Sequence, residues 1–222
     1  MGEIEQVVSA RLERRIRFQD ERARAPRASH IPLARARRWR APFENGYRPA
    51  VQLFVTAKAY VRFCAHAGSD LENEVGGALV GTWRVDRRSG EHFVVVEGVL
   101  RAPYTRHGRA HLTFTQDSLV GLHEALEEHY PGKTFVGWYH THPRMGVFLS
   151  GYDSWLHEHF FPDPWQVALV IDPWSAEGGF FARQQDGWLD PRRYFGFLEL
   201  PSLQGESVVH WRNVTPAPVE GG

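Results

Sequence analysis

The chain has 222 residues, 42% of them hydrophobic, and a formal net charge of zero at pH 7. This composition supports a packed core and excludes a wholly disordered chain, and the length suits one domain with attachments. No apolar run approaches the roughly 20 residues of a membrane-spanning helix, and the N-terminus lacks a signal peptide, so a cytoplasmic protein without membrane contact is expected. The single cysteine, Cys64, excludes an internal disulfide and a cysteine-rich zinc site.

The N-terminal part differs in composition from the rest. An amphipathic helix is predicted over residues 1–25, because apolar residues recur there at three- and four-residue steps. Repeated prolines and arginines predict an Arg/Pro-rich linker, or a strap over the surface, across residues 26–50. Residues 1–48 hold twelve arginines against six acidic residues. We expect this basic arm either to be a solvated face or to contact an acidic surface, with nucleic acid the least expected partner.

From residue 51 to residue 200 the pattern is that of a single α/β (α+β) domain. Apolar residues at helical spacing predict helices over residues 57–67, 116–129 and 153–161. Runs rich in β-branched and aromatic residues predict strands over residues 51–56, 74–85, 92–100, 112–115, 134–139, 166–171, 179–185 and 194–200. Residues 201–222 are expected to form a poorly patterned tail, with a last strand over 208–211 and disorder over 215–222.

The residues with the clearest chemistry lie between His140 and Asp153. His140 and His142 are two residues apart at the end of a predicted strand, so both side chains point to the same face. Asp153 follows at the start of the third predicted helix. Two imidazoles and one carboxylate are a normal ligand set for a catalytic zinc, which keeps a position open for water. Mn²⁺ and Fe²⁺ suit this set less well, so one zinc ion is expected.

A zinc hydrolase also needs a base for the attacking water and a donor for the developing oxyanion. Ser150, three residues before Asp153, is the candidate donor. The base is expected just where the strand over 74–85 begins, with Glu74 as the first choice and Glu72 as the competitor.

Two neighbouring groups of residues have less specific roles. Met145, Val147 and Phe148 lie in the loop between the ligands, where they either pack or line a groove for an extended substrate tail. His157 and His159 form a second His-x-His pair, but in a helix their side chains diverge by about 200°. We therefore expect surface or supporting polar roles for them, and no shared metal.

These motifs resemble a known signature. Two segments resemble the signature of the JAMM (JAB/MPN-domain) zinc metallopeptidases. The first runs from His140 to Asp153 and reads His-x-His-Pro, then Ser-x-x-Asp. The second runs from Glu74 to Gly81 and reads Glu-x-x-Gly-x-Leu-x-Gly. The resemblance covers about residues 51–200 and leaves out the first fifty. It implies an MPN/JAB-like (cytidine-deaminase-like) core, in which a curved mixed β-sheet is flanked by helices, here with an N-terminal helical arm.

The resemblance also implies roles for single residues. It makes His140, His142 and Asp153 the ligands of one zinc ion per chain. It makes Glu74 the general base that activates water and later protonates the leaving amine, and Ser150 the oxyanion stabiliser. No position of the motif is substituted, which disfavours an inactive scaffold.

The activity implied is that of a prokaryotic, deubiquitinase-like isopeptidase, which hydrolyses the bond after the C-terminal glycine of a ubiquitin-like protein. The expected partners are a ubiquitin-like protein or its conjugate and homologues of ubiquitin-activating and ubiquitin-conjugating enzymes. One alternative is a peptidase that acts on a sulfur-carrier protein conjugate. Another is a partner-binding MPN module with secondary hydrolysis, whose N-terminal helix mediates a dimer or partner contact.

Overall fold

The structure is a computed structural model that describes residues 25–219 apart from 43, 45, 47–48 and 103–115. The helix predicted over residues 1–25 falls almost wholly outside the described residues, and the short strand predicted over 112–115 falls outside them entirely. Helices of the described part are η1 (Leu33–Arg35), α2 (Ala57–Ala67), α3 (Gln116–His129) and α4 (Gly151–Phe160). Its strands are β1 (Arg27–Ser29), β2 (Arg37–Arg40), β3 (Gln52–Thr56), β4 (Gly76–Asp86), β5 (His92–Arg101), β6 (Thr134–Thr141), β7 (Val167–Asp172), β8 (Glu177–Ala182), β9 (Phe197–Leu200) and β10 (Thr215–Ala217).

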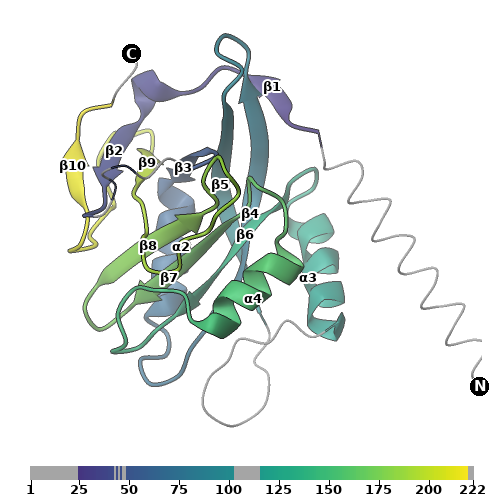
Figure 1. The fold of residues 1–222 in the computed structure, drawn as a ribbon, viewed down its shortest axis with the longest axis vertical. Coiled ribbons are helices and arrows are strands. Elements are labelled where there is room, and N and C mark those ends of the chain that lie inside the picture. Colours follow the sequence, from purple (N-terminus) through teal and green to yellow (C-terminus); the bar gives the residue numbers. More distant parts are fainter. Residues whose placement is uncertain (1–24, 43, 45, 47–48, 103–115, 220–222) are drawn as a thin grey trace, which may run out of the picture.

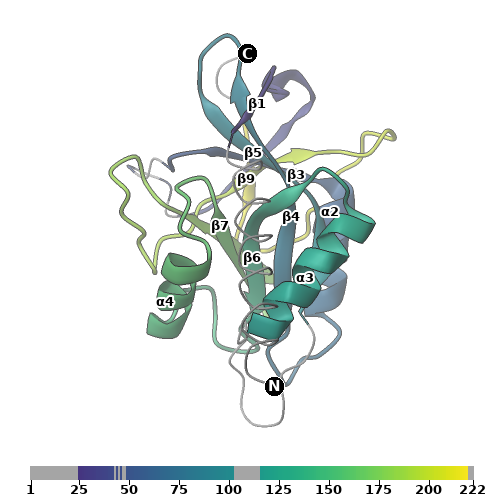
Figure 2. The same ribbon diagram turned by 90° about the vertical axis from the view of Figure 1, so that its right-hand side faces the viewer.

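The strands form one mixed ten-stranded sheet in the order β10-β2-β9-β3-β5-β4-β6-β7-β8, and β1 pairs with β4 off this path. β3 runs parallel to β5 and β9, and β6 runs parallel to β7. The sheet is strongly curled, as the two perpendicular views show (Figures 1 and 2). The α/β fold class predicted from the sequence, a curved mixed sheet flanked by helices, is thereby confirmed.

Helices cover both faces of the sheet. α2 begins at Thr56, whose hydroxyl accepts a hydrogen bond from the Ala59 N–H, and its apolar face buries Tyr60 and Phe63 against the sheet. α3 and α4 pack on a second core, in which Leu122 and Leu156 join Trp138 of β6. β6 is therefore buried on both sides, which suits a strand that carries a site inside the molecule.

Glycines in β4 allow its neighbours to approach closely. A Cβ atom at Gly77 would lie 2.0 Å from the Leu100 carbonyl oxygen, and one at Gly81 would lie 1.8 Å from that of Val95. The β4–β5 register shifts between Val80 and Gly81, so the strand contains an irregularity of the kind that glycines within a strand predict. On its other side β4 is antiparallel to β6, and the register pairs Gly76 with His140.

Residues 26–50, predicted to form an Arg/Pro-rich linker or a strap over the surface, contain two strands of the sheet. β1 pairs with β4, and β2 lies between β9 and β10. Trp39 of β2 is anchored by its indole N–H, which donates to Glu199 at 2.9 Å. A deletion of residues 1–48 would therefore remove part of the sheet as well as the basic arm.

The tail also differs from the prediction. Residues 215–217, expected to be disordered, form β10 and pair with β2. Residues 208–211, expected to form a strand, follow an irregular path in which the Val208 N–H donates to the Glu199 carboxylate at 2.9 Å. The side chain of Glu199 thus replaces the backbone partner that a strand would need.

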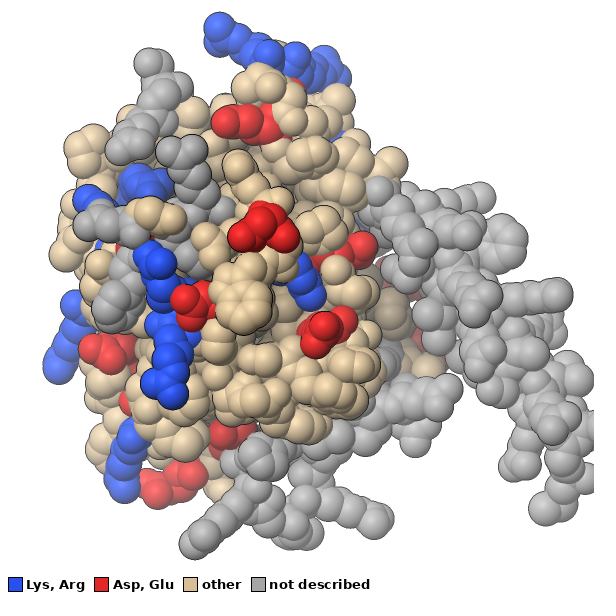
Figure 3. Space-filling view, in the orientation of Figure 1, with Lys and Arg blue, Asp and Glu red and all other residues tan. Residues whose placement is uncertain are grey.

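Basic side chains gather toward the side of the molecule where β2 and β10 lie, whereas acidic side chains lie among uncharged ones at the centre of the same face (Figure 3). Part of this basic character is used within the protein. Arg38 of β2 pairs with Glu44 at 2.7 Å. On β1, away from this side, Arg27 donates to the Gly132 carbonyl at 2.6 Å. The described helices include none with the length and apolarity needed to cross a membrane.

Candidate metal centre

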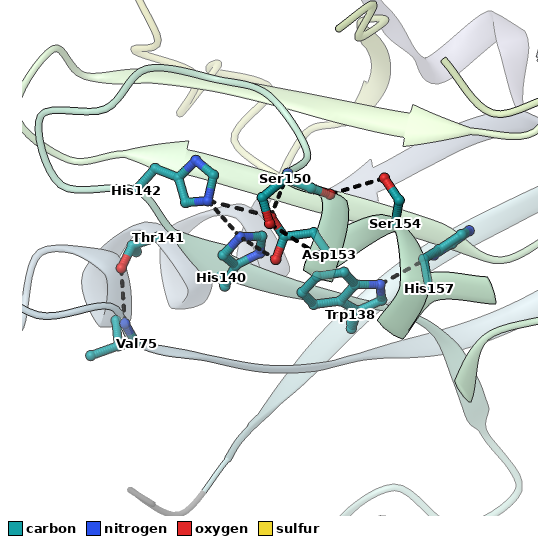
Figure 4. Close-up of polar contacts among 9 residues, drawn as sticks. All are labelled: Val75, Trp138, His140, Thr141, His142, Ser150, Asp153, Ser154 and His157. Atoms are coloured by element: carbon teal, nitrogen blue, oxygen red, sulfur yellow. Dashed lines mark hydrogen bonds and ion pairs between the residues drawn. The ribbon is translucent and has the colours of Figure 1, made fainter. Parts of the chain in front are cut away.

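Three side chains from two elements converge at the end of β6 (Figure 4). His140 lies on β6 and His142 just beyond its last residue, and both point toward α4, as expected for residues two apart along an extended chain. The backbone of His142 is held in place because its N–H donates to the Ile171 carbonyl of β7 at 2.8 Å. Asp153 faces the two rings from the first turn of α4.

The start of α4 fixes Asp153. Ser150 is the N-cap of the helix, and its hydroxyl accepts a hydrogen bond from the Asp153 N–H at 3.1 Å. The Asp153 carboxylate in turn accepts one from the Ser150 N–H at 2.7 Å. This reciprocal capping box sets the orientation of the carboxylate and keeps the Ser150 hydroxyl beside it.

The donor set suits a metal ion. The two Nε2 atoms of His140 and His142 lie 2.8 Å apart, and the Asp153 oxygens lie 3.3 and 3.6 Å from them. Two imidazole nitrogens that face each other need a proton or a cation between them. Ligand atoms around one tetrahedral zinc, with bonds of about 2.0–2.1 Å, lie about 3.3 Å apart. The three side chains are all buried and their ligand atoms lie within 4.8 Å of one another, so they can hold a metal ion.

The charge on the carboxylate is stabilised in place. Burial raises the pKa of Asp153, but hydrogen bonds with His140, His142 and Ser150 outweigh this and hold the pKa well below its usual range. Asp153 is therefore an anion, as a metal ligand must be.

Glu74 and Glu72 occupy different surroundings. Glu74 is half-buried and directly precedes Val75, whose N–H donates to the Thr141 hydroxyl at 2.9 Å. Continuing the β4–β6 register from the Gly76–His140 pair by two residues sets Glu74 opposite His142, on the same face of the sheet. Glu72 is exposed and lies 3.4 Å from an Arg144 nitrogen. Glu74 is thus the acidic residue on the backbone that adjoins the two histidines.

The loop between the ligands presents its three predicted groove residues differently. The Phe148 ring lies 4.7 Å from the His142 ring, centroid to centroid, so it packs against a candidate ligand. Val147 packs against the core under α4, and Met145 is 49% exposed. A substrate groove along these residues stays a prediction.

His157 supports the site from inside the molecule. It is fully buried, and its Nδ1 accepts a hydrogen bond from the indole N–H of Trp138 at 3.1 Å (Figure 4). Trp138 in turn stacks on the His140 ring at 4.8 Å. Burial, followed by the positive charge of Arg183, lowers the pKa of His157 to about 3. His159, by contrast, is exposed on the outer side of the helix.

Sequence reasoning missed Asp172, the last residue of β7. Its carboxylate is 3% exposed and accepts backbone hydrogen bonds from Arg144 and Gly146 at 3.1 and 3.0 Å. It also accepts one from Trp174 at 2.9 Å, so it ties the loop that follows His142 to the turn that follows β7. The signal in the sequence that could have indicated Asp172 is its position at the end of a buried strand, next to the strand that bears the ligands.

Comparison with known proteins gives a consistent family. The family model described as JAB1/Mov34/MPN/PAD-1 ubiquitin protease matches residues 50–161. The chain is 28% identical over 177 residues to 26S proteasome non-ATPase regulatory subunit 14 of Drosophila melanogaster, covering 74% of this chain and 55% of that one. It is 28% identical over 149 residues to COP9 signalosome complex subunit 5 of Candida albicans, covering 64% and 23%.

A third relative matches over a shorter stretch. The chain is 42% identical over 72 residues to a protein of Theionarchaea archaeon (strain DG-70-1) named NAD(+) hydrolase TcpA, covering 32% of this chain and 22% of that one. The chain thus spans between 22% and 55% of the length of these three relatives.

Proposed function

Since this chain belongs to the JAB1/Mov34/MPN/PAD-1 family, we propose that it is a zinc-dependent isopeptidase that hydrolyses the bond after the C-terminal glycine of a ubiquitin-like protein. The observation that carries the proposal is the convergence of His140, His142 and Asp153 beside the backbone that bears Glu74. The family is described as a ubiquitin protease, and two relatives are subunits of the 26S proteasome and of the COP9 signalosome, which supports the choice of a ubiquitin-like substrate.

Each residue has one task in the proposed reaction. His140, His142 and Asp153 would hold the zinc ion, which lowers the pKa of a bound water and polarises the scissile carbonyl. Glu74 would take the proton from the attacking water and return it to the leaving amine. The Ser150 hydroxyl would donate a hydrogen bond to the oxyanion that develops on the carbonyl. Phe148 would limit the space beside His142.

The test is cleavage of a ubiquitin-like protein fused or conjugated through its C-terminal glycine, by the full chain loaded with zinc. Glu74→Gln should lower kcat by about 10²–10⁴-fold while zinc stoichiometry is retained, because the substitution removes the base and leaves the ligands. Glu72→Gln should lower kcat much less than Glu74→Gln, because Glu72 is exposed and not on the backbone beside the two histidines. Glu127→Gln, an exposed position on α3, is the matched control.

Metal dependence gives the second arm. Complete chelation should abolish cleavage, and added Zn²⁺ should restore it. Equal cleavage by wild type, Glu74→Gln and His140→Ala would overturn the proposal, as would activity that survives metal removal. The masses of the products distinguish release of a whole target from release of a single amino acid, the product expected of a peptidase that acts on sulfur-carrier conjugates.

A further inference from the structure

A cluster of side chains outside the metal site joins three segments that meet beside it. We name it the Arg144–Trp174 clasp. The Arg144 guanidinium lies 4.0 Å from the centroid of the Trp174 ring and 3.4 Å from a Glu72 carboxylate oxygen. The Trp174 indole N–H donates to the Leu71 carbonyl at 2.8 Å. The clasp therefore links the ligand loop after His142, the turn after β7 and the segment before β4.

The two members of the clasp share one buried anchor. Asp172 accepts the backbone N–H groups of both Arg144 and Trp174. Arg144 has φ of 64°, a left-handed conformation that a non-glycine residue adopts only when its surroundings hold it there. The backbone of Arg144 and of Trp174 is thus fixed, which fixes where their side chains contact the segment before β4.

The held segment is the one that leads to Glu74. Asp70 accepts the backbone N–H groups of Glu72 and Asn73, each at 2.9 Å, which makes residues 70–73 a compact turn. On the far side of Glu74, Val75 exchanges two hydrogen bonds of 2.9 Å with Thr141. Glu74 therefore lies between a point held by the clasp and a point held by β6.

We propose that Arg144 and Trp174 are positioning residues for Glu74 and hold its carboxylate at the working distance from the metal site. This inference rests on the proposed function, because it concerns the base of that reaction. Arg144 is the residue after the His-x-His-Pro motif, so the clasp fastens the segment of the base directly to the segment of the ligands. The guanidinium contacts Trp174 and Glu72 within the protein, which favours a positioning role over direct contact with the substrate.

The first test is a pair of substitutions in two backgrounds. Trp174→Ala and Arg144→Ala should each lower kcat by about ten- to a hundredfold, with KM and zinc stoichiometry unchanged, because small displacements of a catalytic group are costly. In the Glu74→Gln background the same substitutions should produce no further loss, since there is no base left to position. Trp174→Phe, which keeps one aromatic ring beside Arg144 but loses the second ring of the indole and its N–H, should recover part of the activity.

An equal fold-loss in both backgrounds would overturn the proposal, and so would a loss confined to KM, which would indicate substrate contact. Trp188→Ala removes a tryptophan that is 61% exposed in another loop and serves as the matched control. It should leave kcat unchanged.

The second test does not depend on activity. Amide hydrogen exchange of residues 71–75 should become faster in Trp174→Ala and stay unchanged in Trp188→Ala, while β7 keeps its protection. Unchanged exchange over residues 71–75 would overturn the clasp even if the enzyme is active. If no variant, wild type included, cleaves the substrate, the proposed function fails, and the exchange measurement alone decides whether the clasp holds this segment.

Discussion

The metal-site end and the aromatic end of the molecule are held together by different interactions. At the metal site, buried polar groups such as Asp153, His157 and Asp172 each accept hydrogen bonds of defined geometry. Under α2, Trp211 contacts the rings of Tyr60, Phe63, Phe180 and Phe197 at centroid distances of 5.1 to 6.1 Å. The metal-site end depends on the direction of its hydrogen bonds, and the aromatic end depends on the apolar area in contact.

This difference predicts different consequences of substitution. Apolar packing stabilises roughly in proportion to the area buried, so a truncation at the aromatic end should lower the stability of the whole domain. A hydrogen-bonded carboxylate or imidazole fixes a few neighbouring groups. Its loss should disturb the site and its loops before it unfolds the protein.

Trp211→Ala should have the largest effect, lowering the free energy of unfolding by about 3–5 kcal/mol, because it removes a side chain that is 4% exposed from the centre of the aromatic cluster. Urea unfolding at pH 7 measures the change. Molecules that remain folded should still bind one zinc ion, since Trp211 is not part of the metal site. The free energy of unfolding of Trp188→Ala should stay within about 0.5 kcal/mol of the wild-type value. A loss in Trp188→Ala as large as that in Trp211→Ala would contradict the prediction.

Asp172→Asn should have an intermediate effect of about 1–3 kcal/mol, because one carboxylate oxygen is replaced by a group that cannot accept from the backbone amides. Amide exchange should quicken at Arg144 and Gly146, whose N–H groups donate to the two oxygens. Asp186→Asn is the matched control, an exposed aspartate whose carboxylate accepts the Trp188 N–H. Unaltered exchange at both loop amides would contradict the role given to Asp172.

His157→Phe should change the pH dependence of stability. In the unfolded chain the imidazole takes up a proton near pH 6.5, whereas in the folded protein its pKa is lowered to about 3. Stability from the neutral ring is thus fully present above pH 6.5 and is lost as the pH falls toward 3, by at most about 1.4 kcal/mol per pH unit.

Measuring the unfolding free energy of metal-free protein at pH 7, 6 and 5 tests this prediction. The wild type should lose stability more steeply than His157→Phe over this range, and the contributions of the other histidines cancel in the comparison. His159→Phe, at an exposed position of the same helix, should show the wild-type slope. Parallel slopes for wild type and His157→Phe would rule out the linkage.

The sequence predicted those helices and strands whose formation depends on residues close together in the chain. The observed bounds of α2 and α3 agree with the helices predicted over residues 57–67 and 116–129, because a helix is specified by its own periodicity and its ends. The convergence of His140, His142 and Asp153 also follows from local rules, namely alternation along a strand and a serine cap that begins a helix.

Elements determined by distant partners were missed. β2 has the sequence Arg-Arg-Trp-Arg, which shows no strand alternation, and it is a strand because β9 and β10 pair with it. The role of Asp172 depends on amides 26 and 28 residues earlier in the chain, and the Trp174–Leu71 contact spans 103 residues. No single-sequence pattern connects such positions.

The place of β2 in the sheet has a consequence for how the protein is made. Residues 37–40 emerge from the ribosome before most of the sheet, but both of their neighbours, β9 and β10, are synthesised after β8. The segments that carry the metal site, from Glu74 to Asp172, are complete before either neighbour exists. At a synthesis rate of about 5–20 residues per second, the arginine-rich strand β2 stays without its partner strands for roughly 8–30 s after it is made. This end of the sheet closes only after β10 has been made.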